Sequence, residues 1–77
     1  MSNVLITGAS CGIGAAAARL FAQRGWDVAV NYHASRAEAL ALAAELSGLG
    51  RKAVPIQADI SVPEGAERLV REAEAAL

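Results

Sequence analysis

The sequence predicts an α/β fold in which a parallel sheet is covered by helices on both faces. Three short apolar segments of strand character alternate with three alanine-rich segments of helical character. Hydrophobic residues make up 55% of the chain but aromatic residues only 4%, so alanine, valine and leucine must fill the core, as in helix-covered parallel sheets. Each connection is long enough to contain a helix, which predicts parallel strands with right-handed crossovers. The expected architecture has three layers, with strand order 3-2-1.

The first strand–helix–strand unit begins close to the N-terminus. Residues 3–7 form a short apolar strand, residues 8–12 a loop, and residues 13 to about 24 a helix. Gly25 is expected to end this helix as its C′ residue. Residues 27–32 (D-V-A-V-N-Y) form the second strand.

Two serine–glutamate pairs predict the starts of the remaining helices. Ser35 and Glu38 have the capping-box spacing, and the helix that they begin runs to about Gly48. Ser61 and Glu64 repeat this spacing. The residues expected to face the sheet from the second helix are Ala37, Leu40, Ala41, Ala44 and either Leu46 or Ser47. Those expected from the third are Ala66, Leu69, Val70, Ala73 and Leu77.

The third strand is predicted over residues 52–57. Pro55 interrupts it and favours a position at the edge of the sheet, because proline cannot donate a ladder hydrogen bond.

Charge and cysteine content exclude several classes of function. A net charge of −1 gives no electrostatic case for nucleic acid or an anionic membrane as partner. The single cysteine, Cys11, excludes an internal disulfide and a cysteine-based zinc site, and no metal is expected. We find no signal peptide and no apolar run as long as a membrane span. A reducing cytoplasm is the expected compartment.

The segment from Val4 to Gly14 is an apolar strand that runs directly into a three-glycine loop and a helix. The backbone N–H groups of such a loop and the positive end of the helix dipole form a cradle for a diphosphate. The spacing T-G-x-x-x-G-I-G, placed between a strand and a helix, therefore predicts nucleotide binding. The alternative is that Gly8, Gly12 and Gly14 only make a tight turn and close packing.

Three strand–helix units amount to one mononucleotide-binding half of a Rossmann sheet. Residues 1–77 are therefore predicted to be a partial NAD(P)-binding domain. In the full fold a fourth strand pairs with the free edge of the first, and a bare central strand would be unstable.

Three motifs resemble the N-terminal part of the short-chain dehydrogenase/reductase family. They are the loop at 7–14 (T-G-A-S-C-G-I-G), the strand at 28–32 (V-A-V-N-Y), and Ala58-Asp59-Ile60 after the third strand. The loop is the most specific of the three, and the resemblance covers the whole chain. The strand at 28–32 further resembles that of 3-oxoacyl-carrier-protein reductases and of glucose or sugar dehydrogenases in the family.

The resemblance implies that the loop holds the diphosphate and adenosine ribose of the cofactor. For Ser10, a local turn hydrogen bond is the alternative to a phosphate or ribose contact. Cys11 lies in the same loop, where a tolerated small residue is favoured over a thiol whose pKa is lowered by the helix N-terminus. The residues concerned are Gly8, Ser10, Cys11, Gly12, Ile13 and Gly14, with Thr7 ordering the loop.

By the same resemblance, the carboxylate of Asp59 accepts a hydrogen bond from the adenine amino group and Ile60 lies against the ring. Ligands of such sheets bind at the carboxyl ends of the strands, which favours this role. The alternative for Asp59 is a loop carboxylate that interacts near the predicted cap at Ser61.

The end of the second strand favours NADP over NAD. An acid at this position binds the ribose 2′-OH of NAD, but the sequence places Tyr32 there. A 2′-phosphate can instead be received by polar residues around it, with Arg36 as the charged partner. NAD remains an alternative because Cys11 stands where many NADP-using relatives carry a basic residue. The residues expected at the 2′ position are Asn31, Tyr32, His33, Ser35 and Arg36.

Each of these polar side chains also has a purely structural interpretation. Arg36 can be a solvated residue at a helix start, Ser35 a helix cap and His33 an ordinary exposed loop residue.

Catalytic residues are not expected in this chain. The family uses a Tyr-x-x-x-Lys pair on a helix, whereas the single tyrosine Tyr32 and single lysine Lys52 lie far apart in the sequence. We therefore expect the cofactor-binding part of a longer, homo-oligomeric oxidoreductase that transfers hydride between nicotinamide and a carbonyl or alcohol substrate. The alternative is a stand-alone or degenerate nucleotide-binding module without catalysis.

Overall fold

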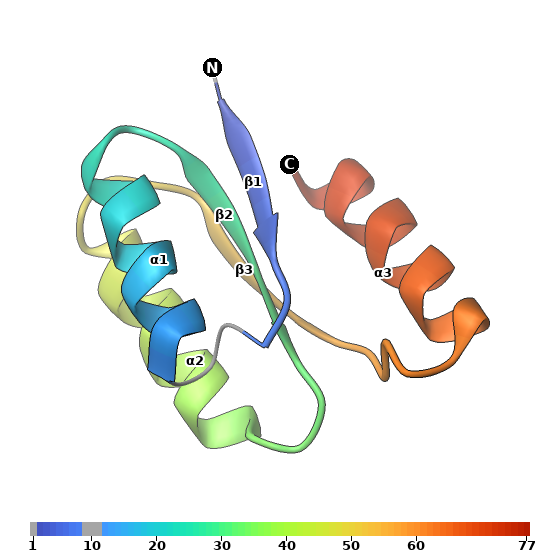
Figure 1. Cartoon of the computed structure of the whole chain (residues 1–77). Coiled ribbons are helices and arrows are strands. Elements are labelled where there is room, and N and C mark those ends of the chain that lie inside the picture. The colour runs from blue at the N-terminus through green and yellow to red at the C-terminus, as the bar shows by residue number, and fades with distance from the viewer. Residues whose placement is uncertain (1, 9–11) are drawn as a thin grey trace.

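The computed structural model describes residues 2–8 and 12–77 of the chain. Strands and helices alternate throughout, which confirms the predicted order with small shifts at the element ends (Figure 1). The bounds are β1 Asn3–Ile6, α1 Gly12–Gln23, β2 Asp27–Tyr32, α2 Arg36–Ser47, β3 Ala53–Gln57 and α3 Pro63–Ala76.

The three strands form one parallel sheet in the order β1-β2-β3, which is the predicted order 3-2-1 read from the other edge. Ile6 pairs with Val30, and Tyr32 pairs with Gln57. The carboxyl ends of the three strands therefore lie at one edge of the sheet, followed there by the segments that lead into the helices. Pro55 lies in β3, which pairs only with β2 among the described strands, as its missing N–H predicts.

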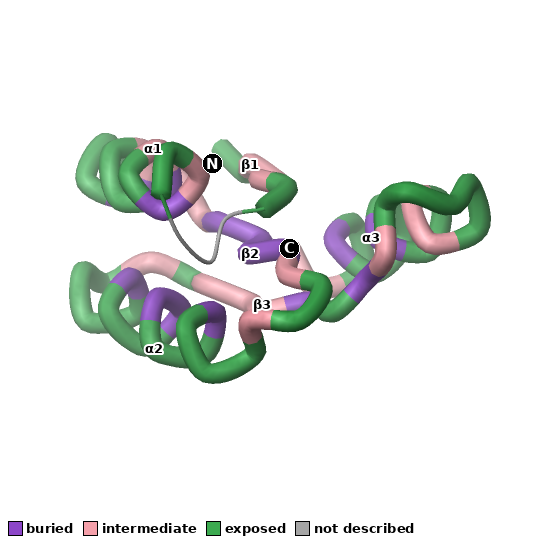
Figure 2. The backbone as a smooth tube through the Cα atoms, turned by 60° about the horizontal axis from the view of Figure 1, so that its bottom comes forward, coloured by how far each residue is buried: buried purple, intermediate pink, exposed green. Residues whose placement is uncertain are grey.

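The helices cover both faces of the sheet, α1 and α2 on one and α3 on the other (Figure 1). Side chains alternate along β2, so Val28 and Val30 pack against α1 and α2 while Ala29 packs on the α3 side. Figure 2 shows β2 as the buried centre of the three layers.

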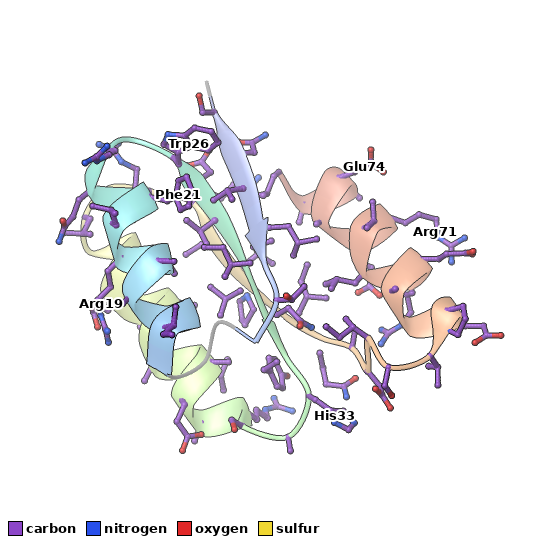
Figure 3. The ribbon with its side chains drawn as sticks, viewed as in Figure 1. Arg19, Phe21, Trp26, His33, Arg71 and Glu74 are labelled. Carbon is purple, nitrogen blue, oxygen red and sulfur yellow. The ribbon has the colours of Figure 1, made fainter. Side chains whose placement is uncertain are left out.

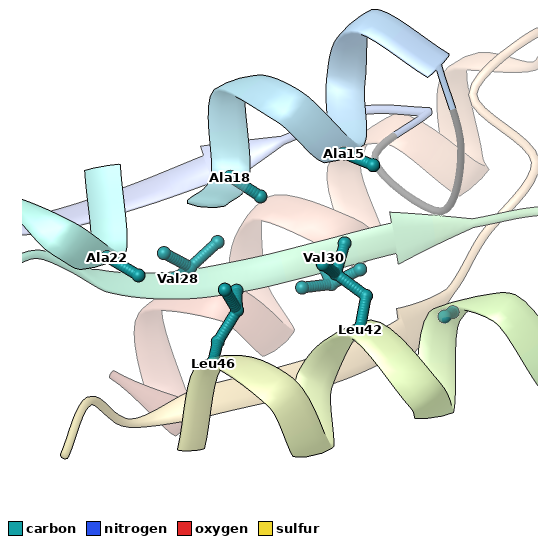
Figure 4. Close-up of a cluster of buried hydrophobic side chains, with 8 residues drawn as sticks. Ala15, Ala18, Ala22, Val28, Val30, Leu42 and Leu46 are labelled. Atoms are coloured by element: carbon teal, nitrogen blue, oxygen red, sulfur yellow. The ribbon is translucent and has the colours of Figure 1, made fainter. Parts of the chain in front are cut away.

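The larger core cluster joins small side chains of α1 to branched side chains of β2 and α2 (Figure 4). Because α1 presents alanines to the sheet, its axis can approach β2 closely. This packing holds the N-terminal end of α1 beside the carboxyl ends of the strands. The buried residues of the cluster are Ala15, Ala18, Ala22, Val28, Val30, Ala39, Leu42 and Leu46.

The layer formed by α3 is less complete. Leu69 and Ala73 are buried as predicted, but Val70 is 48% exposed although it was expected on the same face. No described element lies beyond β1 to cover the Val70 side chain. A shallow groove of about 510 Å³ therefore runs between β1 and α3, lined by Asn3, Val4, Leu5, Val70, Ala73, Glu74 and Leu77.

The sheet-facing side of α2 differs from the prediction. Leu40 is 44% exposed, and of the expected residues only Leu46 is buried. The segment R-A-E-A-L-A-L-A-A-E-L-S places alanines on opposite sides of the helix, so the sequence pattern does not define one apolar face. The buried residues are Ala39, Leu42, Ala43 and Leu46.

Neither predicted serine cap is formed. Ser35 is the N-cap residue of α2, but its side chain makes no capping hydrogen bond. At α3 the N-cap residue is Val62, one position after the serine, and Pro63 begins the helix with a φ that suits its first turn. Ser61 instead bonds to Asp59 in the preceding loop.

Candidate functional site

The candidate site is the carboxyl edge of the sheet, where the segments after β1, β2 and β3 meet the N-terminal end of α1 (Figure 1). The structure places most of the sequence-predicted residues along this edge. They are Thr7, Gly8, Gly12, Ile13, Gly14, Asn31, Tyr32, His33, Ser35, Arg36, Asp59 and Ile60. Ser10 and Cys11 lie outside the described residues, so the structure adds nothing to the predictions for them.

Two glycines with left-handed backbone bracket the connection from β1 to α1. Gly8 has φ +59° and Gly12 has φ +61°, a region that other residues enter only at a cost. A Cβ atom added to either would meet no described atom within 4 Å, so the described residues leave space open next to both backbones. This is the geometry that a ligand needs if it is to approach a backbone closely.

The amide of Gly8 has a partner within the protein, because it donates to Oδ1 of Asn31 at 3.3 Å. Gly8 therefore contributes its left-handed backbone to the site, since its N–H is already engaged by Asn31.

The first two residues of α1 are exposed, and its first turn carries no acidic residue. Ile13 is 90% exposed, and Gly14 is half-buried. Nothing in this turn neutralises the positive end of the helix dipole, so the helix start can attract an anion.

Asp59, which follows β3, holds a local hydrogen-bonded turn. Its Oδ1 accepts the amide of Ser61 at 3.0 Å and the hydroxyl of Ser61 at 2.6 Å. These two hydrogen bonds, with a smaller effect of nearby His33, hold the pKa of Asp59 below its ordinary value. The loop interaction near Ser61 that we considered as the alternative is therefore present. Sequence reasoning took Ser61 for a helix cap and missed this role.

The second carboxylate oxygen of Asp59 faces His33. Its Oδ2 lies 3.7 Å from Nε2 of His33, and both side chains remain accessible, at 42% and 65%. The carbonyl of His33 accepts from Nε2 of Gln57 at 3.3 Å, and the carbonyl of Gln57 accepts from Nη2 of Arg68 at 2.8 Å. The carboxyl ends of β2 and β3 and the second turn of α3 are thus linked by hydrogen bonds (His33 is labelled in Figure 3).

The end of β2 carries no carboxylate, as the sequence predicts. Tyr32 is half-buried and packs against the cluster formed with α1 and α2. Ser35 is half-buried, and its carbonyl accepts the amide of Ala39 at 3.0 Å. Arg36 is exposed at the first position of α2.

Asn31 is buried, unlike Tyr32 and His33, which follow it. Its side chain is 2% exposed and is engaged with backbone groups rather than directed outward. The geometry therefore favours a role other than direct contact with a phosphate. The sequence feature that points to this role is an amide directly after the apolar run 28–30.

The groove between β1 and α3 contains none of the candidate cofactor residues. Among residues 2–8 and 12–77, no three histidine, cysteine or acidic side chains are arranged to hold a metal ion. No helix in this part of the chain is both long and apolar enough to cross a membrane.

Comparison with known proteins gives a consistent result. Residues 2–77 match the family model for short chain dehydrogenase. The chain is 46% identical over 71 residues to an L-rhamnose 1-dehydrogenase (NAD(P)(+)) from a Sphingomonas strain. It is 36% identical over 70 residues to a 3-oxoacyl-[acyl-carrier-protein] reductase of Staphylococcus epidermidis. These matches cover 92% and 91% of the chain, respectively.

Solved structures agree with the fold. A short chain dehydrogenase from Burkholderia cenocepacia, solved with NADP, has a TM-score of 0.92 and 41% identity over 97% of the chain. A blue fluorescent protein from a metagenomic library, solved with NADPH, has a TM-score of 0.93 and 39% identity over 96% of the chain.

The chain spans less than a third of the length of these relatives. The match covers 28% of the rhamnose dehydrogenase, 29% of the reductase, and 30% and 31% of the two solved chains.

Proposed function

Since the chain belongs to the short-chain dehydrogenase family, we propose that its sheet edge binds NADP as the cofactor-binding part of an oxidoreductase. The observation that carries this proposal is the pair of left-handed glycines, Gly8 and Gly12, that brackets the turn into α1. Together with a helix start free of acidic residues, they leave open backbone next to a positive dipole end. A diphosphate fits this combination of space and charge.

The adenosine half of the cofactor would lie along the ends of β2 and β3. Oδ1 of Asp59 is occupied by Ser61, so Oδ2 is the atom that would accept the adenine amino group. Ile60 is 47% exposed and would lie against the ring. Asp59 is held in its ionised, accepting form by the hydrogen bonds that lower its pKa.

Preference for NADP over NAD rests on the charges after β2. No carboxylate stands at the end of this strand to repel a 2′-phosphate, and Arg36 is exposed nearby. His33 is also accessible on this side. The neighbours solved with NADP and NADPH support this preference, while the NAD(P)(+) relative keeps NAD as a second cofactor.

The reaction proposed for the whole protein is hydride transfer between nicotinamide and a carbonyl or alcohol substrate, with a homo-oligomer as the expected assembly. The cofactor would supply the hydride. This chain would contribute binding of the diphosphate and adenosine, because Tyr32 and Lys52 lie at opposite edges of the sheet and cannot act as a catalytic pair.

This separation of Tyr32 from Lys52 also supports the second candidate, a nucleotide-binding module without catalysis. A cytoplasmic location stays a prediction from the cysteine content.

Calorimetric titration with NADPH and NADH tests the proposal. We expect Gly12→Ala to weaken NADPH binding by about fivefold or more, because a side chain strains the left-handed backbone at the diphosphate by about 1–2 kcal/mol. Gly50→Ala is the matched control, since Gly50 has φ +81° but lies in the turn before β3 at the opposite edge. Absence of binding to either cofactor, or equal weakening by both variants, would overturn the proposal.

A further inference from the structure

Asn31 is the only buried polar side chain among the residues that the structure describes. It follows Val28, Ala29 and Val30 in β2, all of them buried and apolar. Burying an amide is unfavourable unless its hydrogen bonds are replaced, so an apolar residue would be the simpler choice for packing alone.

The side chain of Asn31 replaces those hydrogen bonds with backbone groups from three segments. Oδ1 accepts the amide of Gly8 at 3.3 Å. Nδ2 lies 3.3 Å from the carbonyl oxygens of Ile56 and Ala58 and 3.4 Å from that of Tyr32. Each of these bonds is long and individually weak, but together they reach the ends of all three strands.

These contacts begin where the backbone pairing of β1 stops. The last paired residues of β1 and β2 are Ile6 and Val30, so Gly8 lies beyond the ladder. The Asn31 amide is the group that ties Gly8 to β2. On the other side it binds the carbonyl of Ala58, the residue directly before Asp59.

We propose that Asn31 is a positioning residue that fixes the start of the glycine segment after β1, at Gly8, relative to the 58–60 segment after β3. This inference rests on the proposed function, in which the first of these segments holds the diphosphate and the second the adenine. A cofactor that touches both segments needs a fixed spacing between them, because misplacement weakens every contact that it makes. Asn31 does not touch the cofactor in this arrangement.

The test compares Asn31→Leu and Asn31→Asp with the original protein in two measurements. Hydrogen exchange of the Gly8 amide, followed by nuclear magnetic resonance, reports the hydrogen bond without any ligand. Titration with NADP reports the consequence for binding. For Asn31→Leu we expect faster Gly8 exchange and affinity lowered about five- to tenfold, as the loss of a buried hydrogen-bond partner implies.

The pH dependence of NADP affinity in Asn31→Asp is a measurement that a purely structural role of Asn31 would not change. Its ionised carboxylate would face three carbonyl oxygens, whereas the protonated acid restores both a donor and an acceptor. Affinity of this variant should therefore recover as pH is lowered from about 8 to about 5.5, since burial raises the pKa of such a carboxyl. His33, Asp59 and Arg68 also lie at this edge and are present in both variants, so Asn31→Leu corrects for their titration.

Leu46→Ala is the control for lost stability, because Leu46 of α2 is buried among residues of α1, α2 and β2, a cluster that includes no residue of either segment. It should lower the unfolding midpoint and leave the affinity of the folded protein unchanged. Unaltered NADP affinity in Asn31→Leu with accelerated Gly8 exchange would overturn the positioning role. A failure of the original protein to bind NADP would refute the proposed function instead, while unaltered Gly8 exchange in Asn31→Leu would refute the inference by itself.

Discussion

The hydroxyl of Ser61 donates to Oδ1 of Asp59 at 2.6 Å, and the amide of the same serine donates to the same oxygen at 3.0 Å. Both bonds favour the ionised carboxylate and hold the pKa of Asp59 below its ordinary value of 3.8. The turn after β3 is therefore stabilised by a negative charge.

This relationship predicts a pH-dependent stability. A carboxyl whose pKa is lower in the folded state stabilises the fold above its unfolded pKa, and the contribution is lost as pH falls through the folded value. Asp59→Asn should therefore lower the urea midpoint of unfolding at about pH 7, and the gap to the original protein should close towards about pH 3. Urea titrations across this range measure the gap. A gap of constant size at all pH values would contradict the assignment.

The variant Ser61→Ala tests whether Ser61 or His33 is the main cause of the lowered pKa of Asp59. Because the bonds from Ser61 lower the pKa of Asp59 more than His33 does, removal of the hydroxyl should raise that pKa towards its ordinary value. His33→Gln should have a smaller effect. The carboxyl carbon resonance of Asp59, followed by pH titration, gives both shifts, and the reverse ranking would show that the histidine dominates.

Replacement of Gly65 in α3 by alanine is predicted to destabilise the protein. A Cβ atom there would overlap the carbonyl oxygen and carbon of Asp59, so the loop before the helix would have to move. Gly65→Ala should destabilise the protein by about 1–3 kcal/mol although alanine is the better helix former. Thermal unfolding measures this effect, and Glu67→Ala on the exposed side of α3 should change stability by less than about 0.5 kcal/mol. Stabilisation by Gly65→Ala would mean that the loop yields without cost.

Strand and turn positions were largely predictable from the sequence. The apolar run of β1, the sequence D-V-A-V-N-Y of β2 and the left-handed glycines after α1 and α2, Gly25 and Gly50, define the order of elements, because burial and left-handed backbone each require particular residue types. The same logic located the edge at which the candidate residues gather.

Partners of polar side chains were not predictable to the same degree. Ser61 has the spacing of a cap but bonds backwards to Asp59, and Asn31 follows an apolar run but bonds inward to Gly8. Sequence spacing states which groups are near along the chain. It does not state which of several donors and acceptors meet after three strands have been aligned.

The sequence also left open which face of α2 packs on the sheet, and this can be tested directly. Leu46 is fully buried against β2, whereas Leu40 of the same helix is 44% exposed. Leu46→Ala should cost about 2–5 kcal/mol in unfolding free energy, because it leaves a cavity in the core. Leu40→Ala should cost much less. Denaturant unfolding of the two variants decides the orientation, and similar costs would mean that α2 is rotated relative to the sheet.

Cofactor preference is predicted to depend on Arg36, on the premise that the sheet edge binds NADP. Arg36 is exposed at the start of α2, close to where a 2′-phosphate would lie, and Arg36→Glu reverses the local charge. Loss of a charge-assisted hydrogen bond together with repulsion should weaken NADPH binding by about tenfold or more. Binding of NADH, which lacks the phosphate, should change little.

Arg71→Glu is the matched control for this charge reversal, because it makes the same change in net charge on the exposed surface of α3 (Figure 3). It should leave the ratio of NADPH to NADH affinity unaltered. Competition titrations with both cofactors give this ratio for each variant. A ratio that is the same in Arg36→Glu as in the original protein would remove Arg36 from the 2′-phosphate site and leave His33 as the other accessible candidate at the end of β2.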